Sequence, residues 1–207
     1  MHKLLLISLV MFSTVGYSQS YTKVENSAFV KNRINIKAQK TTSISANFQE
    51  IIHSSMYNDS KKATGELKYK QANKIRWEHF TPKKQIVLIN GSKVRLYENG
   101  KEVRNVASNQ IIKKVQSLMM QLFSGEFLNE KEFYVGYYEN EKSYKLNLKP
   151  KNGRMSKYIT RVEMYFNKED LTLNKMVLME SDTDKIVYSF SSVTINRQIS
   201  ETNFTKF

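Results

Sequence analysis

Residues 65–101 read GELKYKQANKIRWEHFTPKKQIVLINGSKVRLYENGK, and this stretch decides the fold. Apolar and polar residues alternate through it in short runs, which is the pattern of half-buried β-strands. Thr81-Pro82 ends one run, because proline cannot donate to a sheet ladder and restricts the residue before it. Asn90-Gly91 and Asn99-Gly100 separate apolar runs and have the chemistry of tight hairpin turns. The stretch therefore predicts four strands of an up-and-down antiparallel meander.

The same alternation continues on both sides of this meander. It predicts further strands at 41–55, 101–106, 132–138, 143–149, 157–166, 171–179 and 186–195. Together with the meander, this makes about eleven strands in a mainly β protein. So many strands with one apolar face predict a strongly curved sheet with helices against its concave side.

Two helices are predicted to cover that side. Thr22-Lys23-Val24-Glu25 has the Thr-x-x-Glu form of a capping box and predicts a helix from Thr22 to about Gln39. Ser108–Phe123 has one apolar stripe of period 3.6. Ser108 can cap the start of this helix, and Gly125 can follow its end in a left-handed conformation. The stripe consists of Ile111, Ile112, Val115, Leu118, Met119, Leu122 and Phe123.

Residues 1–18 have the form of a secretory signal peptide. Lys3 supplies the positive charge, residues 4–12 the apolar core, and Gly16-Tyr17-Ser18 a small-x-small cleavage site. The apolar run is too short to span about 30 Å of hydrocarbon. We therefore expect cleavage near Ser18, export, and a single domain from residue 19 to residue 207.

The chain is strongly basic, with a formal net charge of +14, and it contains no cysteine. Such a charge attracts anions such as phospholipid head groups or acidic partners. The lysines are spread along the sequence, which is typical of the solvated faces of strands and helices. An exported protein meets little nucleic acid, so we predict no nucleic-acid partner, and we expect a monomer.

Sequence signals for catalysis are lacking. Only His53 and His79 remain after cleavage, and the chain has no Gly-x-Ser-x-Gly, His-Glu-x-x-His or glycine-rich phosphate loop. Without cysteine, two well-separated histidines do not suggest a metal site. His79 shares a face with Ile75 and Trp77, which is typical of a half-buried structural histidine. We predict neither an enzyme nor a cofactor.

The apolar positions instead indicate an interior that either forms a solid core or binds an apolar ligand. The candidate lining residues are Phe48, Leu67, Tyr69, Ile75, Trp77 and Leu96, together with the stripe from Ile111 to Phe123. Methionine in that stripe adapts to ligands of variable shape. Periodicity alone does not distinguish a core from a cavity.

A series of short motifs resembles the LolA family of periplasmic carriers of outer-membrane lipoproteins. The motifs, in order, are Gly65-Glu66-Leu67, Arg76-Trp77-Glu78, Pro82, Gln85-Ile86-Val87, Asn90-Gly91 and Leu96-Tyr97. ANFQE at 46–50, LNLKPK at 146–151 and NFTKF at 203–207 extend the resemblance over almost the whole mature chain.

The resemblance implies an open, twisted antiparallel half-barrel lidded by helices, with a cavity that receives the acyl chains of lipoproteins. Such carriers work in the periplasm of Gram-negative bacteria. They take cargo from an inner-membrane ABC transporter and hand it to an outer-membrane acceptor. Gln71-Ala72 falls where many members carry Arg-Pro, and that arginine holds the lid closed. A neutral glutamine makes weaker hydrogen bonds.

Two alternatives use the same fold. The cargo could be another amphiphile, such as a glycolipid. The protein could instead be an envelope module that senses stress or binds proteins.

Overall fold

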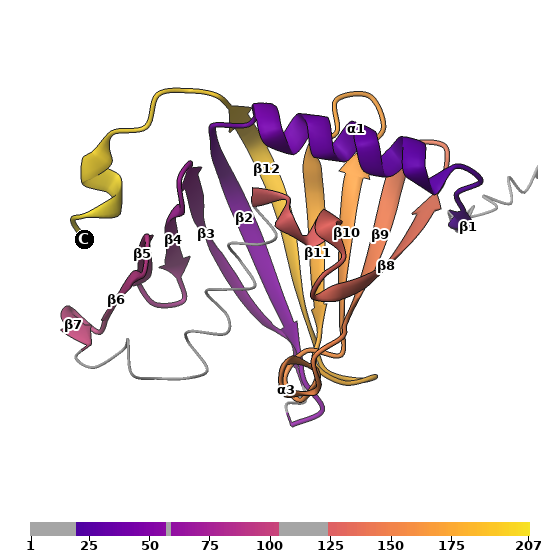
Figure 1. The fold of residues 1–207 in the computed structure, drawn as a ribbon. Helices are drawn as coiled ribbons and strands as arrows, with labels where there is room; N and C mark the ends of the chain where they lie inside the picture. Colours follow the sequence, from indigo (N-terminus) through magenta and orange to yellow (C-terminus); the bar gives the residue numbers. More distant parts are fainter. Residues whose placement is uncertain (1–19, 57–58, 104–123) are drawn as a thin grey trace, which may run out of the picture.

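The computed structural model describes residues 20–56, 59–103 and 124–207, which build one open antiparallel sheet of twelve strands (Figure 1). The strand order is β1-β8-β9-β10-β11-β12-β2-β3-β4-β5-β6-β7. The strands are β1 (Thr22–Lys23), β2 (Ser43–His53), β3 (Lys61–Lys70), β4 (Lys74–Thr81), β5 (Gln85–Asn90), β6 (Lys93–Glu98), β7 (Lys101–Val103), β8 (Phe133–Glu139), β9 (Ser143–Pro150), β10 (Arg161–Asn167), β11 (Leu173–Met179) and β12 (Lys185–Ile195). The predicted fold class is confirmed.

The sheet consists of two meanders joined at β2. The first runs from β2 to β7, and the second runs from β8 to β12. β2 pairs with β3 on one side and with β12 on the other, so the last strand of the chain lies beside the first long one. Helix α1 (Ser27–Lys40) runs across the strands of the second meander (Figure 1). The other helical segments among the described residues are short: η2 (Glu126–Asn129), α3 (Gly153–Ser156) and η3 (Glu201–Phe204).

The prediction of a helix beginning at Thr22 is wrong. Thr22 and Lys23 form β1 and pair with Glu139 and Tyr138 of β8, which accounts for the twelfth strand. The capping box cannot form, because its first residue belongs to the sheet. Asn26 caps α1 instead, and its side chain accepts a hydrogen bond from the Phe29 amide.

Two smaller differences concern a turn and the start of a strand. Asn90 of β5 still pairs with Lys93 of β6, so the turn between these two strands lies at Gly91-Ser92 rather than at Asn90-Gly91. The strand expected at 157–166 begins at Arg161, because a helical turn, α3, precedes it. The turn at Asn99-Gly100 is confirmed, since both residues have positive φ. The signal peptide at 1–18 and the helix at 108–123 lie outside the described residues.

The sheet is buried on both faces along β5. Val87 and Ile89 share the face that packs toward α1, whereas Ile86 and Leu88 point to the outer face and are 0% and 1% exposed. η3 lies over β4 and β5 on this outer face, where Phe204 is 2% exposed. The C-terminal segment therefore covers an apolar strip that a half-barrel would otherwise expose.

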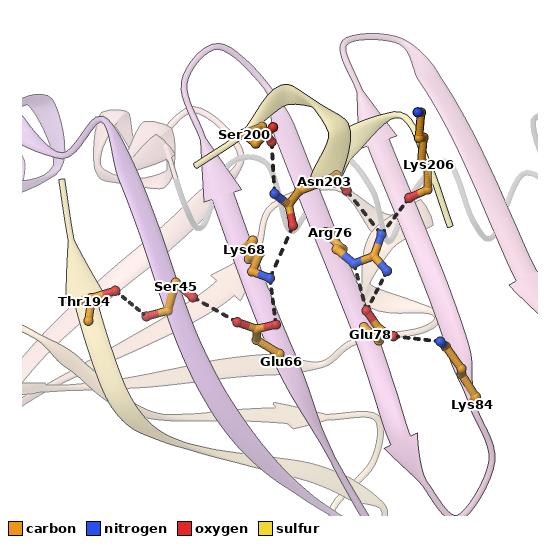
Figure 2. A network of polar contacts seen from close by, with 10 residues as sticks. All are labelled: Ser45, Glu66, Lys68, Arg76, Glu78, Lys84, Thr194, Ser200, Asn203 and Lys206. Carbon is orange, nitrogen blue, oxygen red and sulfur yellow. Dashed lines mark hydrogen bonds and ion pairs between the residues drawn. The ribbon is translucent and has the colours of Figure 1, made fainter. Parts of the chain in front are cut away.

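Figure 2 shows how β4 holds this segment. The guanidinium of Arg76 donates to the Lys206 carbonyl at 2.8 Å and to the Asn203 carbonyl at 3.2 Å. It also contacts Glu78, with Nη2 2.6 Å from Oε2. Both side chains are largely buried, and a buried charge is stable only when paired and hydrogen-bonded. Arg76 anchors the C-terminal segment directly and Glu78 holds Arg76 in place, and both residues belong to the motif Arg76-Trp77-Glu78.

Glu201 adds a second anchor. Its carboxylate lies between Lys70 and Lys74, at 2.6 and 2.7 Å. The hydrogen bonds from these lysines lower the pKa of Glu201 to about 2.

Phe204→Ala should lower the free energy of unfolding by about 3–5 kcal/mol, because it removes a buried aromatic side chain and leaves a cavity. Urea denaturation followed by circular dichroism measures this change. Phe80→Ala is the matched control, since Phe80 is 52% exposed and its loss should cost within about 0.5 kcal/mol. Equal effects of the two changes would show that η3 does not close the outer face.

Candidate functional site

The strand register gathers apolar side chains on the inner, concave face of the sheet. Ala46 of β2 stands opposite Leu67 of β3, which stands opposite Trp77 of β4. Ile44, Tyr69 and Ile75 form the neighbouring row in the same way. Because side chains alternate along a strand, each such row points to one face. This face continues through β12 to β8 as one apolar cluster.

The predicted lining residues of the sheet all lie on this face. Phe48, Leu67, Tyr69, Ile75 and Trp77 are buried, and Leu96 is half-buried against them. The predicted stripe from Ile111 to Phe123 lies outside the described residues. Further apolar residues of the face come from the second meander: Leu146, Leu148, Met164, Phe166, Met176 and Phe190.

Aromatic rings occupy the middle of the face. The ring centroid of Phe48 lies 5.3 Å from that of Trp77 and 5.9 Å from that of Tyr188. Trp77 and Tyr188 meet edge to face at 5.1 Å. Gly65 makes room for this aromatic cluster, because a Cβ there would overlap the Phe48 ring and the Glu78 carbonyl.

A small apolar cavity lies between α1 and the sheet. Its volume is about 80 Å³, and its walls come from α1, β2, β3, β10, β11 and β12. The walls include Ile34, Ala46, Leu67, Phe166, Leu173 and Phe190. An engineered apolar cavity that binds benzene measures about 150 Å³. The apolar cavity therefore has no room for a long acyl chain while α1 stays in place.

Few buried groups hold α1 against the sheet. Val30 and Ile34 are the buried residues of this helix, whereas Phe29 and Ile36 are 55% and 42% exposed. Burying two such aliphatic side chains contributes about 3–6 kcal/mol. The helix is thus held by fewer buried side chains than a long central strand such as β2.

Polar contacts from α1 reach the second meander. Arg33 donates to the Tyr144 hydroxyl and to the Lys168 carbonyl, both at 3.2 Å. Lys31 forms an ion pair with Glu130 at 2.7 Å. Gln71 is exposed in the β3–β4 turn, and its backbone amide donates to the Thr42 carbonyl. Lys31 and Arg33 thus supply polar side-chain contacts from α1 to the second meander and the segments next to it.

A polar group interrupts the apolar face beside the aromatic cluster. Glu50 accepts a hydrogen bond from the Tyr188 hydroxyl at 2.8 Å, and its other oxygen lies 2.7 Å from His79 Nε2. Burial, reinforced by the Glu50 charge, raises the pKa of the Tyr188 hydroxyl well above its usual value, so it remains a donor.

Sequence reasoning missed this group, although a signal was present. Alternation along β2 places Glu50 on the face of Phe48, and alternation along β12 places Tyr188 between Ile186 and Phe190. His79 was predicted as structural, and its contact with a buried carboxylate agrees with that role.

The described residues show neither a membrane-spanning helix nor a metal-binding cluster. No helix within 20–56, 59–103 and 124–207 combines the length and apolarity needed to cross a bilayer. The same residues contain no group of three or more His, Cys, Asp or Glu side chains placed to hold a metal ion.

Comparisons with known proteins identify relatives. Residues 39–206 match the family described as outer membrane lipoprotein carrier protein LolA. The chain is 26% identical over 202 residues to an outer-membrane lipoprotein carrier protein of Francisella philomiragia, covering 95% of this chain and 91% of that protein. A Coxiella burnetii protein of the same name is 21% identical over 160 residues, 77% of this chain and 74% of that one.

Among solved structures, the chain is similar to that of MucB, with a TM-score of 0.50 and 10% identity. The match covers 86% of this chain and 62% of MucB. At this identity the likeness shows the fold alone.

Gly65→Ala should destabilise the protein by about 1–3 kcal/mol, because the new methyl group must displace the Phe48 ring or the β4 backbone. Fluorescence of Trp77, the single tryptophan of the chain, should also shift, since its ring packs on Phe48. Gly153→Ala is the control, because no atom of the described chain lies within 4 Å of the added carbon. If both variants unfold at the same urea concentration, Gly65 does not set the packing of the cluster.

Proposed function

This chain belongs to the LolA family of outer membrane lipoprotein carrier proteins, and from that premise we propose that it carries lipoproteins by holding their acyl chains against the concave face. One observation carries the proposal. An apolar face extends across the sheet, and the helix that crosses it buries two aliphatic side chains. A ligand that buries more apolar surface can replace such a helix.

The free energies favour this exchange. Each CH₂ group moved out of water gains about 0.8 kcal/mol. About eight such groups offset the 3–6 kcal/mol that Val30 and Ile34 contribute. The acyl chains of a lipoprotein are longer than this, so they can displace α1 and occupy its place. Because the apolar cavity measures about 80 Å³, it has to widen for the chains to enter, and a shift of α1 widens it.

Release follows from the same exchange in reverse. When the chains leave, α1 regains its contacts, and this gain offsets part of the loss of cargo burial. Arg33 supports the closed position through Tyr144 and Lys168. In this chain Arg33 takes over the closing role that the resemblance assigned to the position of Gln71.

The route of the protein in the cell is part of the proposal. Residues 1–18 direct export, and cleavage near Ser18 releases the carrier into the periplasm. The carrier receives cargo from an inner-membrane ABC transporter and delivers it to an outer-membrane acceptor. Family membership and the signal sequence support this route.

A synthetic triacylated lipopeptide tests the binding step. Wild-type protein should bind it saturably, with a change in Trp77 fluorescence, because that ring lies on the proposed binding face. Leu173→Glu places a charge in the wall of the apolar cavity and should weaken binding at least tenfold. Asn174→Glu is the control, because Asn174 follows Leu173 in β11 and its own side chain is exposed. Failure of the wild type to bind, or equal weakening in both variants, would reject the carrier function.

Removing the Arg33 contacts should make cargo enter faster. Arg33→Met loses two hydrogen bonds that are long and only part-buried, so together they contribute about 1 kcal/mol and their loss makes the open state several-fold more populated. Stopped-flow mixing with the lipopeptide should show an association rate increased several-fold. Lys40→Met removes the same charge at the exposed end of α1 and should leave the rate unchanged. An unchanged rate in Arg33→Met would mean that this arginine does not hold α1 closed.

A further inference from the structure

A second and larger cavity opens at the other end of β2. Its volume is about 500 Å³, within the 300–1,000 Å³ of typical ligand pockets. It lies between the end of β2, the start of β3 and the loop from β4 to β5. In contrast to the apolar cavity, its walls combine apolar and charged residues: Glu50, Ile52, Ala63, His79, Pro82 and Glu98, with the lysines described below.

Glu50 and His79 form the buried part of the wall. The Glu50 side chain is 9% exposed, and its oxygens contact Tyr188 and His79. His79 Nδ1 is buried as well, and it has no hydrogen-bond partner in the part of the chain that the structure describes. Buried polar atoms are almost always hydrogen-bonded, so such an atom indicates a missing partner. Polar residues on an otherwise apolar face thus point to a polar ligand group at this cavity.

The rim of this polar cavity is basic. Four lysines line it: Lys61, Lys62, Lys83 and Lys84. Lys84 lies 3.4 Å from Glu78 on the outer face. Lys61 pairs with Ile52 of β2 and so shares the face of Glu50, and Lys61 and Lys83 are both exposed. Exposed lysines at the mouth of a cavity attract an anion.

The aromatic cluster lies between the two cavities along β2. Ala46 lines the apolar cavity, Phe48 belongs to the cluster, and Glu50 lines the polar cavity. All three share one face of the strand, and four residues of a strand span roughly 13 Å. One amphiphile can therefore place its chains by α1 and its head group by the lysines.

We propose that the polar cavity binds an anionic head group, phosphate or carboxylate, of an amphiphile whose chains lie on the apolar face. This inference rests on the proposed carrier function and adds a class of ligand to it. Lys61 and Lys83 supply the charge. His79 can donate from Nδ1 to the head group while Nε2 donates to Glu50, when the ring carries both protons, and Glu50 and Tyr188 hold the ring in place.

Three soluble probes test the head-group site: lysophosphatidylglycerol with one myristoyl chain, monomyristoylglycerol, and glycerol 3-phosphate. Calorimetric titration of the full mature protein should show that the anionic lipid binds at least fivefold more tightly than the neutral one. In the double variant Lys61→Gln/Lys83→Gln this preference should disappear, while affinity for the neutral lipid stays the same. The control is Lys23→Gln/Lys40→Gln, which removes two exposed charges elsewhere and should keep the preference.

Each other outcome counts against the site. Equal binding of both lipids, or equal loss of preference in the two double variants, would overturn it while leaving acyl-chain binding intact. Glycerol 3-phosphate binding as tightly as the anionic lipid would assign the cavity to a free phosphate rather than to an amphiphile. If neither lipid binds, the carrier function itself fails, and the head-group site fails with it.

Discussion

The register of β2 between β12 and β3 is the constraint on which the rest of the molecule depends. It places Ala46, Phe48 and Glu50 on the face that meets α1 and leaves Asn47 and Gln49 exposed. A slip by one residue would exchange the two sets, because the side-chain period of a strand is two. The apolar cavity, the aromatic cluster and the buried carboxylate all follow from this one alignment.

Alternation in the sequence was sufficient to predict most of the sheet and its apolar face. The meander from Gly65 to Lys101 was predicted correctly apart from one turn, since turn residues and alternation are both local signals. Long-range pairing was not predictable in this way. Thr22 has a helix-capping pattern, but its backbone pairs with Glu139, which is distant in sequence. Local preference yields to such pairing when the sheet offers an edge.

The candidate site was predicted in part for the same reason. Phe48 and Trp77 were found because they alternate with polar neighbours. For Ile86 and Leu88 alternation did not indicate which face is buried, because residues 86–89 are all apolar. The residues that cover their outer face come from the end of the chain. Glu50 was overlooked because a charged side chain is expected to face solvent, even where Phe48 and Ile52 beside it on the same face are apolar. Its partners, His79 and Tyr188, come from strands far apart in sequence.

An open sheet has two edges, and in the described part of the chain each ends in a short, charged strand. β1 has two residues and includes Lys23, while β7 has three and includes Lys101 and Glu102. Long, flat, apolar edges recruit strands from other molecules, whereas brief edges with lysine discourage this pairing. The two end strands therefore discourage pairing with strands of other molecules at the places where they close the sheet.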